Sequence, residues 1–294
     1  MASWRDVLVV CLAALFGALS VLAVRAWLQE PRLAAVDPVR REAVEVPTAL
    51  EGPSPAERGR HLVDHVLACG ACHGDGLGGA LVEGPGGTRI WAPDLTATGA
   101  GARYDEAAWR RVLTEGIGLG GLPLRAMPVG RWSTLASDDL DAVVRHLRTL
   151  PGPGRPTPRD VSGAGWGWWA TEDPGLEVSP RRAPDVRHGA YLAALGGCLD
   201  CHGVDLRGGP ARVGTAVAPA LVGDVGTPWS GADFAAAVLR GEGRAGTRLG
   251  PSMPWRFFAG LHDTEVDALW AFVRALDAGE VAVAPPPRGA PRAP

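Results

Sequence analysis

The sequence predicts an all-α protein made of two similar helical domains that follow an N-terminal transmembrane helix. Three observations lead to this prediction. The 294-residue chain contains an internal duplication, its periodic segments have helical spacing, and residues 7–24 are all apolar or small. Two copies indicate two domains rather than a solenoid, because a solenoid needs at least three repeats to bury a continuous core.

The duplication is clearest around two methionines. Residues 127–150 (MPVGRWSTLASDDLDAVVRHLRTL) align without a gap with residues 253–276 (MPWRFFAGLHDTEVDALWAFVRAL). Apart from Met1, the chain uses methionine only at Met127 and Met253, the first position of each copy. A protein that filled its cores with methionine would not stop at two, so we expect both to have a specific role.

Helical segments recur at corresponding places in the two copies. Glycines mark the ends of the shorter helices, and the last helices open with acidic turns that suit the helix dipole. Trp109 and Phe234 are expected to face inward. Ala142 and Ala268 are expected to allow close helix crossing. The expected helices cover residues 57–68, 105–116, 186–195 and 231–243, together with the segments that follow Asp138 and Asp263.

Each copy also carries the pattern Cys-x-x-Cys-His, as CGACHG and CLDCHG. This pattern is typical of covalent haem c attachment, in which two thiols bond the porphyrin and the histidine binds the iron. A methionine follows at a similar distance in each half, and a thioether is a suitable ligand for the other face of the iron. The sequence therefore predicts two haem c groups. Their expected attachment residues are Cys69, Cys72, Cys198 and Cys201, and their expected iron ligands are His73, Met127, His202 and Met253.

Other uses of the cysteine pairs fit less well. The two pairs lie too far apart in sequence for the ligands of one zinc ribbon. No βαβ pattern surrounds them, as a thioredoxin-like dithiol would require. A disulfide across two residues would restrain little. For the two methionines, core packing remains the alternative.

Proline segments follow the two histidines, APDL at residues 92–95 and APAL at residues 218–221. A ligating histidine usually donates its second ring N–H to a carbonyl or carboxylate, which fixes its tautomer. The carbonyls of Pro93 and Pro219 are the candidates, and a simple turn role is the alternative. Two arginines near these segments are candidates for pairing with haem propionates, Arg89 and Arg212.

With these motifs, residues 57–150 and 184–277 resemble tandem class I cytochromes c, especially the cytochrome subunits of membrane-bound dehydrogenases. The resemblance implies that each half is a few helices wrapped around one covalently bound haem. It implies no catalytic residue, since such modules transfer electrons without chemistry of their own. It also implies a periplasmic location, because haem is attached outside the cytoplasmic membrane in this family.

The apolar segment at residues 7–24 predicts a membrane anchor. At 1.5 Å per residue it spans roughly 27 Å, close to the thickness of the hydrocarbon core. Trp4 and Trp27 flank it, as interfacial aromatic residues do. We expect a single uncleaved pass through the cytoplasmic membrane with the C-terminal domains in the periplasm. A cleaved signal peptide is the alternative.

The expected organisation has a proline-rich linker between the domains. Its tryptophan cluster, Trp166, Trp168 and Trp169, could pack between the domains, dock a partner or form an apolar clamp. The expected segments are an anchor at 1–25, a tether at 26–52, cytochrome domains at 53–151 and 183–278, the linker at 152–182 and a proline-rich tail at 279–294.

The composition does not suggest nucleic acid as a partner. The net charge is −3, all 29 basic residues are arginine, and no basic stripe suggests nucleic acid. His61 and His65 lie four residues apart on a predicted helix. We expect them to face solvent, with a zinc pair as the alternative.

The expected function is one-electron transfer between redox proteins. The partners expected are a membrane-bound dehydrogenase, a quinol-oxidising complex or a terminal oxidase. The main alternative is a di-haem peroxidase-like enzyme, which needs one iron open to its substrate. A methionine in both halves favours the carrier. A haem-based sensor or a structural membrane anchor is a third possibility, which no attached signalling domain supports.

Overall fold

The computed structural model divides the chain into two units, Met1–Gly52 and Pro53–Pro294. The predicted anchor, the tether and the tryptophan cluster lie outside the described residues. None of the described helices is long and apolar enough to cross a membrane. The structure describes residues 54–83, 89–124, 126–152, 161–162, 180, 182–210, 217–223 and 229–281.

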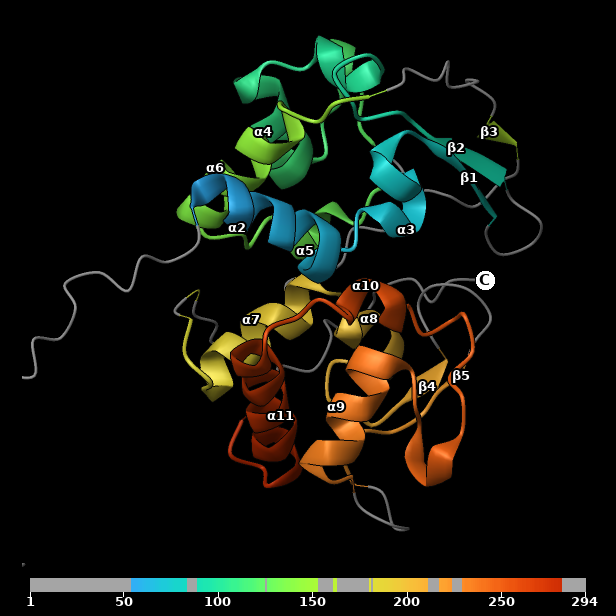
Figure 1. Cartoon of the computed structure of the whole chain (residues 1–294), viewed down its shortest axis with the longest axis vertical. Coiled ribbons are helices and arrows are strands. Elements are labelled where there is room, and N and C mark those ends of the chain that lie inside the picture. Colours follow the sequence, from blue (N-terminus) through green and yellow to red (C-terminus); the bar gives the residue numbers. More distant parts are fainter. Residues whose placement is uncertain are drawn as a thin grey trace, which may run out of the picture. The chain divides into compact units, whose positions relative to one another are not determined.

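The second unit is mostly helical, and its two halves repeat one order of elements (Figure 1). The first half contains α2 (Pro55–His61), the π-helical turn η1 (Leu62–Val66), α3 (Gly70–His73), α4 (Glu106–Glu115), α5 (Val129–Trp132) and α6 (Ser137–Leu147). The second half contains α7 (Val186–Leu195), α8 (Cys198–His202), α9 (Gly231–Arg240), α10 (Trp255–Phe258) and α11 (Asp263–Asp277). Short 3-10 turns lie at Asp75–Leu77, Ala100–Arg103, Leu119–Gly121 and Arg244–Gly246.

Local sequence signals define the ends of the helices. At the start of α4 the Asp105 side chain accepts a hydrogen bond from the backbone N–H of Ala108 (2.7 Å), and Gly116 ends the helix in the left-handed conformation. In α9, Ser230 and Gly241 have the same two roles. Trp109 is buried. These helices confirm the predictions for residues 105–116 and 231–243, and Phe234 is buried as expected.

Two helix crossings are so close that they exclude a side chain. A Cβ added to Gly59 in α2 would lie 2.0 Å from the carbonyl oxygen of Ala142 in α6. A Cβ added to Gly189 in α7 would lie 1.9 Å from the carbonyl oxygen of Ala268 in α11. The expectation that the two alanines mark close crossings is therefore confirmed, and the sequence analysis missed the glycine on the opposite helix.

Short strands accompany the helices, so the all-α expectation was incomplete. Strand β1 (Ala80–Glu83) pairs antiparallel with β2 (Arg89–Ala92), and β2 pairs with β3 (Val161–Ser162), which lies in the expected linker. In the second half, β4 (Gly209–Pro210) pairs with β5 (Val217–Ala218). Strands of two to four residues are too short for alternating hydrophobicity to reveal them.

The hydrophobic core draws on both halves. Its buried residues form one continuous cluster, and the largest fully buried side chains include Trp109 from the first half and Tyr191 and Phe272 from the second. Each half alone has few residues with which to build a core. Sharing buried surface between the two halves compensates for that.

Candidate haem sites

The first Cys-x-x-Cys-His motif forms the helix α3. Cys69 precedes the helix, and Cys72 and His73 lie within it. His73 is buried, whereas Cys72 is exposed and Cys69 is half-buried. The ring Nδ1–H of His73 donates to the carbonyl oxygen of Pro93 at 2.8 Å.

The second motif repeats this geometry in α8. Cys198 and Cys201 are half-buried, and His202 is buried. The ring Nδ1–H of His202 donates to the carbonyl oxygen of Pro219 at 2.9 Å. Both histidine–proline contacts proposed from the sequence are therefore present.

These hydrogen bonds determine which ring nitrogen is available to a metal. A carbonyl only accepts, so Nδ1 carries the proton and Nε2 keeps its lone pair. Burial lowers the pKa of His73 and of His202, and the proline carbonyls oppose this effect in part. Both rings are thus held as neutral imidazoles, which is the form that binds iron.

A tight loop brings each histidine to its proline. The backbone N–H of Gly79 donates to the carbonyl of His73 (2.9 Å), and that of Gly208 to the carbonyl of His202 (2.8 Å). Both glycines have positive φ. A Cβ on Gly208 would lie 2.6 Å from the carbonyl oxygen of Ala218, so the close approach of the proline segment depends on glycine here.

The two methionines occupy equivalent places. Met127 and Met253 each precede a proline and a four-residue helix, α5 in the first half and α10 in the second. Both are half-buried and pack against the same core as Cys69 and Cys198. A thioether sulfur is only a weak hydrogen-bond acceptor, so it can be buried without a polar partner and still serve as a soft ligand.

Buried donors offer a separate test of whether a cofactor fits. The indole N–H groups of Trp109, Trp132 and Trp229 are buried and have no hydrogen-bond acceptor among the described residues. An unpaired buried donor costs about 1–3 kcal/mol. Carboxylates such as haem propionates would supply acceptors, so these residues fit the group that the two motifs imply.

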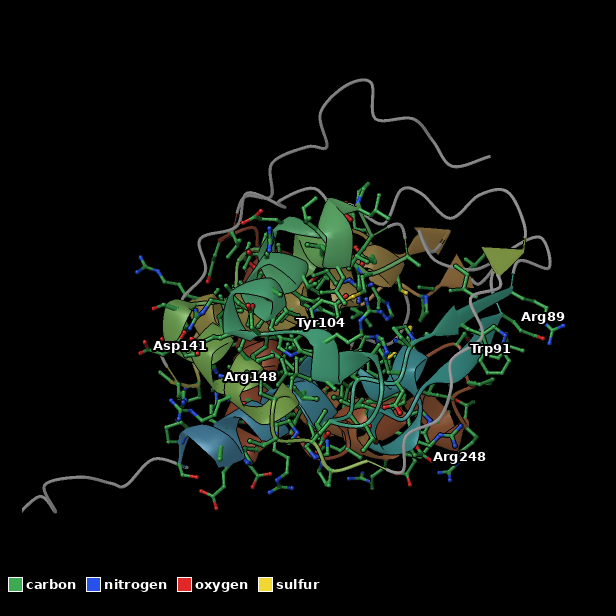
Figure 2. All side chains as sticks on the ribbon, turned by 90° about the horizontal axis from the view of Figure 1, so that it is seen from above. Arg89, Trp91, Tyr104, Asp141, Arg148 and Arg248 are labelled. Atoms are coloured by element: carbon green, nitrogen blue, oxygen red, sulfur yellow. The ribbon has the colours of Figure 1, made fainter. Side chains whose placement is uncertain are left out.

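The two arginines proposed as propionate partners have different outcomes. Arg89 lies on the exposed side of β2 with Trp91 (Figure 2) and pairs with Glu83 at 3.8 Å. Arg212 lies outside the described residues.

The pKa values of the motif cysteines are unlike those of a redox dithiol. Burial, with the neighbouring Cys72, raises the pKa of Cys69 to about 12, and burial raises the pKa of Cys198 to about 11. Reactive dithiols of the thioredoxin type depend on a lowered thiol pKa. The cysteine environments therefore do not support that alternative.

A salt bridge joins the first half to the second motif. The Arg131 guanidinium in α5 pairs with Asp200, which lies between Cys198 and Cys201. Both side chains are largely buried. The positive charge of Arg131 also acts on Cys72, so it lies near both motifs. Sequence analysis missed this pair.

The second half makes a corresponding contact with the first cysteine motif. Phe257 aligns with Arg131 in the repeat, and its ring packs on Gly70 of the first motif, where an added Cβ would lie 3.1 Å from the ring. Each methionine-proline helix therefore packs on the cysteine motif of the other half. The alignment of Arg131 with Phe257 was visible in the sequence, but nothing local indicated that either residue crosses between the halves.

The expectation that His61 and His65 face solvent is wrong. His61 is buried, and His65 is half-buried with its Nδ1–H donating to the carbonyl oxygen of Phe257 at 2.9 Å. His61 Nε2 lies 2.7 Å from a carboxylate oxygen of Glu265 in the second half. Both rings are covered because the second half packs against this face of α2 and η1.

Comparisons with known proteins agree with the two sites. Residues 54–147 match the family described as cytochrome c oxidase, cbb3-type, subunit III, and residues 186–277 match the family described as cytochrome c. The chain therefore belongs to the c-type cytochromes and carries two cytochrome c domains. The cysteine pairs of these domains imply haem c.

A curated relative has a similar segment. The chain is 31% identical over 135 residues to one of the subunits of nicotinate dehydrogenase from Pseudomonas putida. The match covers 38% of this chain and 11% of that protein. The likeness thus concerns a small part of the relative.

Proposed function

We propose that the protein is a membrane-anchored periplasmic electron carrier that holds two covalently bound haem c groups and transfers single electrons between redox proteins. The observation that carries the proposal is the repeated site. In each half a buried histidine is fixed by a proline carbonyl, lies beside a cysteine pair and is matched by one half-buried methionine. Haem supplies a reversible one-electron couple when bound, and histidine–methionine ligation raises its reduction potential.

The residues of the chain have defined roles in this proposal. The four motif cysteines would anchor the porphyrins, and His73 and His202 would bind the irons through Nε2. Met127 and Met253 would supply the second protein ligand to each iron, which would exclude water and other small ligands. Pro93 and Pro219 orient the two histidines through their carbonyls. Such sites change little in structure between oxidation states, which suits an electron carrier rather than an enzyme.

A dehydrogenase is the proposed electron donor. The support is the resemblance to the nicotinate dehydrogenase protein, which is by its name part of a substrate-oxidising enzyme. A quinol-oxidising complex as donor, or a terminal oxidase as acceptor, would use the same haem sites. Co-purification of the chain with its neighbours in the membrane would identify the partner. The apolar segment at residues 7–24 supports attachment to the cytoplasmic membrane.

Carbon monoxide binding separates the carrier from a di-haem peroxidase-like enzyme. A carrier with two closed irons should be six-coordinate and low-spin in both oxidation states, and the reduced protein should bind carbon monoxide poorly. An enzyme needs one iron that is open, or that opens on half-reduction. A high-spin signal with stoichiometric carbon monoxide binding at one haem of the wild type would overturn the carrier proposal.

A further inference from the structure

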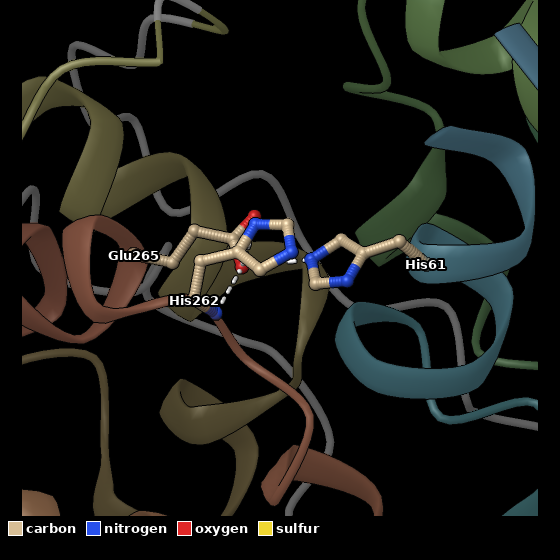
Figure 3. Close-up of side chains that lie close together, drawn as sticks. All are labelled: His61, His262 and Glu265. Atoms are coloured by element: carbon tan, nitrogen blue, oxygen red, sulfur yellow. Dashed lines mark hydrogen bonds and ion pairs between the residues drawn. The ribbon is translucent and has the colours of Figure 1, made fainter. Parts of the chain in front are cut away.

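Three titratable side chains from the two halves lie close together (Figure 3). His61 extends from α2, whereas His262 and Glu265 come from the start of α11. Their ligand atoms, one from each residue, all lie within 4.8 Å of one another. The two imidazole rings stack with their centroids 4.2 Å apart.

We propose that His61, His262 and Glu265 form a binding site for a divalent transition-metal ion that bridges the two cytochrome domains. Two imidazoles and one carboxylate, with a position left for water, form a donor set used by zinc sites. Imidazole ligands favour Zn²⁺, Cu²⁺ and Ni²⁺ over Mg²⁺ and Ca²⁺.

The distances suit such an ion after small side-chain adjustments. His61 Nε2 lies 2.7 Å from Glu265 Oε2, and His262 Nδ1 lies 3.7 Å from the same oxygen. Ligand atoms around a tetrahedral zinc ion are roughly 3.4 Å apart, given metal–ligand bonds of about 2.0–2.2 Å. The ion takes the place of the proton between His61 and Glu265, and the His61 ring then carries its proton on Nδ1.

The balance of charge around Glu265 favours a cation. Arg58 binds Asp139 through two hydrogen bonds of 2.9 and 3.0 Å, and its third contact, at 3.2 Å, is with Glu265 Oε1. One guanidinium thus faces two buried carboxylates. A buried negative charge is costly unless it is paired. A cation on the Oε2 side, either a protonated His61 or a metal ion bound to its ring, completes the pairing.

Two of the three ligands, Glu265 and His262, are in protonation states that bind a metal ion. Burial alone would raise the pKa of Glu265, but hydrogen bonds from His61 and the backbone N–H of His262, with the charge of Arg58, lower it to about 2. Burial and then the charge of His61 lower the pKa of His262. Near neutral pH the cluster therefore offers a carboxylate and a neutral imidazole. Arg58 fixes the carboxylate by binding its other oxygen, as partners of metal-ligating carboxylates commonly do.

The test is a titration of the haem-loaded, chelator-treated protein, without any histidine tag, with ZnCl₂ in a calorimeter. The wild type should bind one equivalent of Zn²⁺ at this site. His262→Asn should weaken that binding by at least about 100-fold, since even loss of a residue that only supports a ligand costs 10–100-fold. His262 is the suitable position because its side chain is 59% exposed, and asparagine also starts helices well.

His146→Gln is the matched control. It removes a half-buried histidine of α6 that is not part of the cluster, and it should bind Zn²⁺ as the wild type does. Zn²⁺ should also raise the melting temperature of the wild type and of His146→Gln, but not of His262→Asn. Absence of Zn²⁺ binding by the wild type, or equal affinity in the wild type and His262→Asn, would overturn the proposal.

Discussion

At the scale of single residues, the orientation of each motif histidine is set by one proline carbonyl. Pro93 and Pro219 each accept the Nδ1–H of the preceding motif histidine, which leaves Nε2 of His73 and His202 as the atom available to a metal. The same loop in each half, closed through a glycine, sets this geometry. In the proposed sites, the backbone therefore places each histidine ligand, whereas the methionine ligand depends on one side chain.

That dependence makes the methionines the most informative residues to change. We expect Met127→Ala to open only the first iron, and Met253→Ala to open only the second. Each change should lower the potential of its own haem by on the order of 100 mV, a fraction of the range that axial ligands cover, because loss of the thioether favours ferric iron. A spectroelectrochemical titration, with carbon monoxide binding, measures both effects. A variant with an unchanged spectrum would remove that methionine from the ligand set.

The pair of Arg131 and Asp200 is a second critical contact. Arg131→Gln and Asp200→Asn should each lower the free energy of unfolding by about 3 kcal/mol, because either change leaves a largely buried charge without its partner. The double variant should be more stable than the sum of the two losses predicts, by about 1–3 kcal/mol. Urea unfolding of the haem-loaded protein measures all three values.

Arg110→Gln is the control for this cycle. Arg110 pairs with Glu106 and Asp141 on the surface, and its loss should lower the free energy of unfolding by no more than about 1 kcal/mol.

Additive effects of Arg131→Gln and Asp200→Asn on the free energy of unfolding would show that the two side chains do not interact in solution.

At the scale of elements, the packing of each half depends on one helix crossing. The first and last helices of the first half, α2 and α6, meet at Gly59 and Ala142, and those of the second half, α7 and α11, meet at Gly189 and Ala268. Small residues on both sides let the backbones approach. The crossing also brings Arg58 within reach of Asp139, so it sets the position of the charges that lie between the halves.

Gly59→Ala should therefore destabilise the protein by about 1–3 kcal/mol or more, because the added methyl group would force the two helices apart. The measurement is the melting temperature and the urea midpoint of the haem-loaded protein. Gly78→Ala serves as the control, since its added Cβ would meet only the Asp75 carbonyl oxygen at 4.0 Å. Equal stability of the two variants would contradict the close crossing.

Elements with strong local signals were predictable from the sequence. The range Val186–Leu195 matches the expected helix, and capping residues marked α4 and α9. Both histidine–proline contacts also followed from the motifs. The strands were missed because they are too short for a periodic pattern.

Contacts between distant residues were not predictable. Arg131 and Asp200 are 69 residues apart, and His61 and Glu265 are 204 apart. A buried charge and an exposed one look alike in a sequence. Asp139 and Glu265 belong to the acidic first turns of the last helices, which the sequence analysis interpreted only as favourable for the helix dipole. The structure gives them a second role, as the buried carboxylates that bind Arg58.

At the scale of the whole molecule, the duplication has diverged where the halves meet. Arg131 in one copy corresponds to Phe257 in the other, so one contact is ionic and its counterpart is apolar. The haem motifs, by contrast, kept the same cysteine spacing and the same histidine geometry. The unchanged motifs and the diverged contact together fit two equivalent cofactor sites joined by an asymmetric contact.

The predicted anchor has a direct test at this scale. Removing residues 1–25 and supplying a cleavable export signal should yield a soluble protein with both haems attached, because the cytochrome domains do not include that segment. The measurements are partition between membrane and soluble fractions, and haem content. Recovery of the native protein in soluble form with a trimmed N-terminus would show that the segment is a cleaved signal.

The intact mass of the denatured, purified protein tests the central claim most directly. Covalent attachment survives denaturation, so the mass should exceed that of the polypeptide by two haems. Cys72→Ser with Cys69→Ser should reduce this excess to one haem, and the same changes at Cys198 and Cys201 should remove the other. A wild-type mass that corresponds to one haem, or to none, would contradict the assignment of two haem c sites.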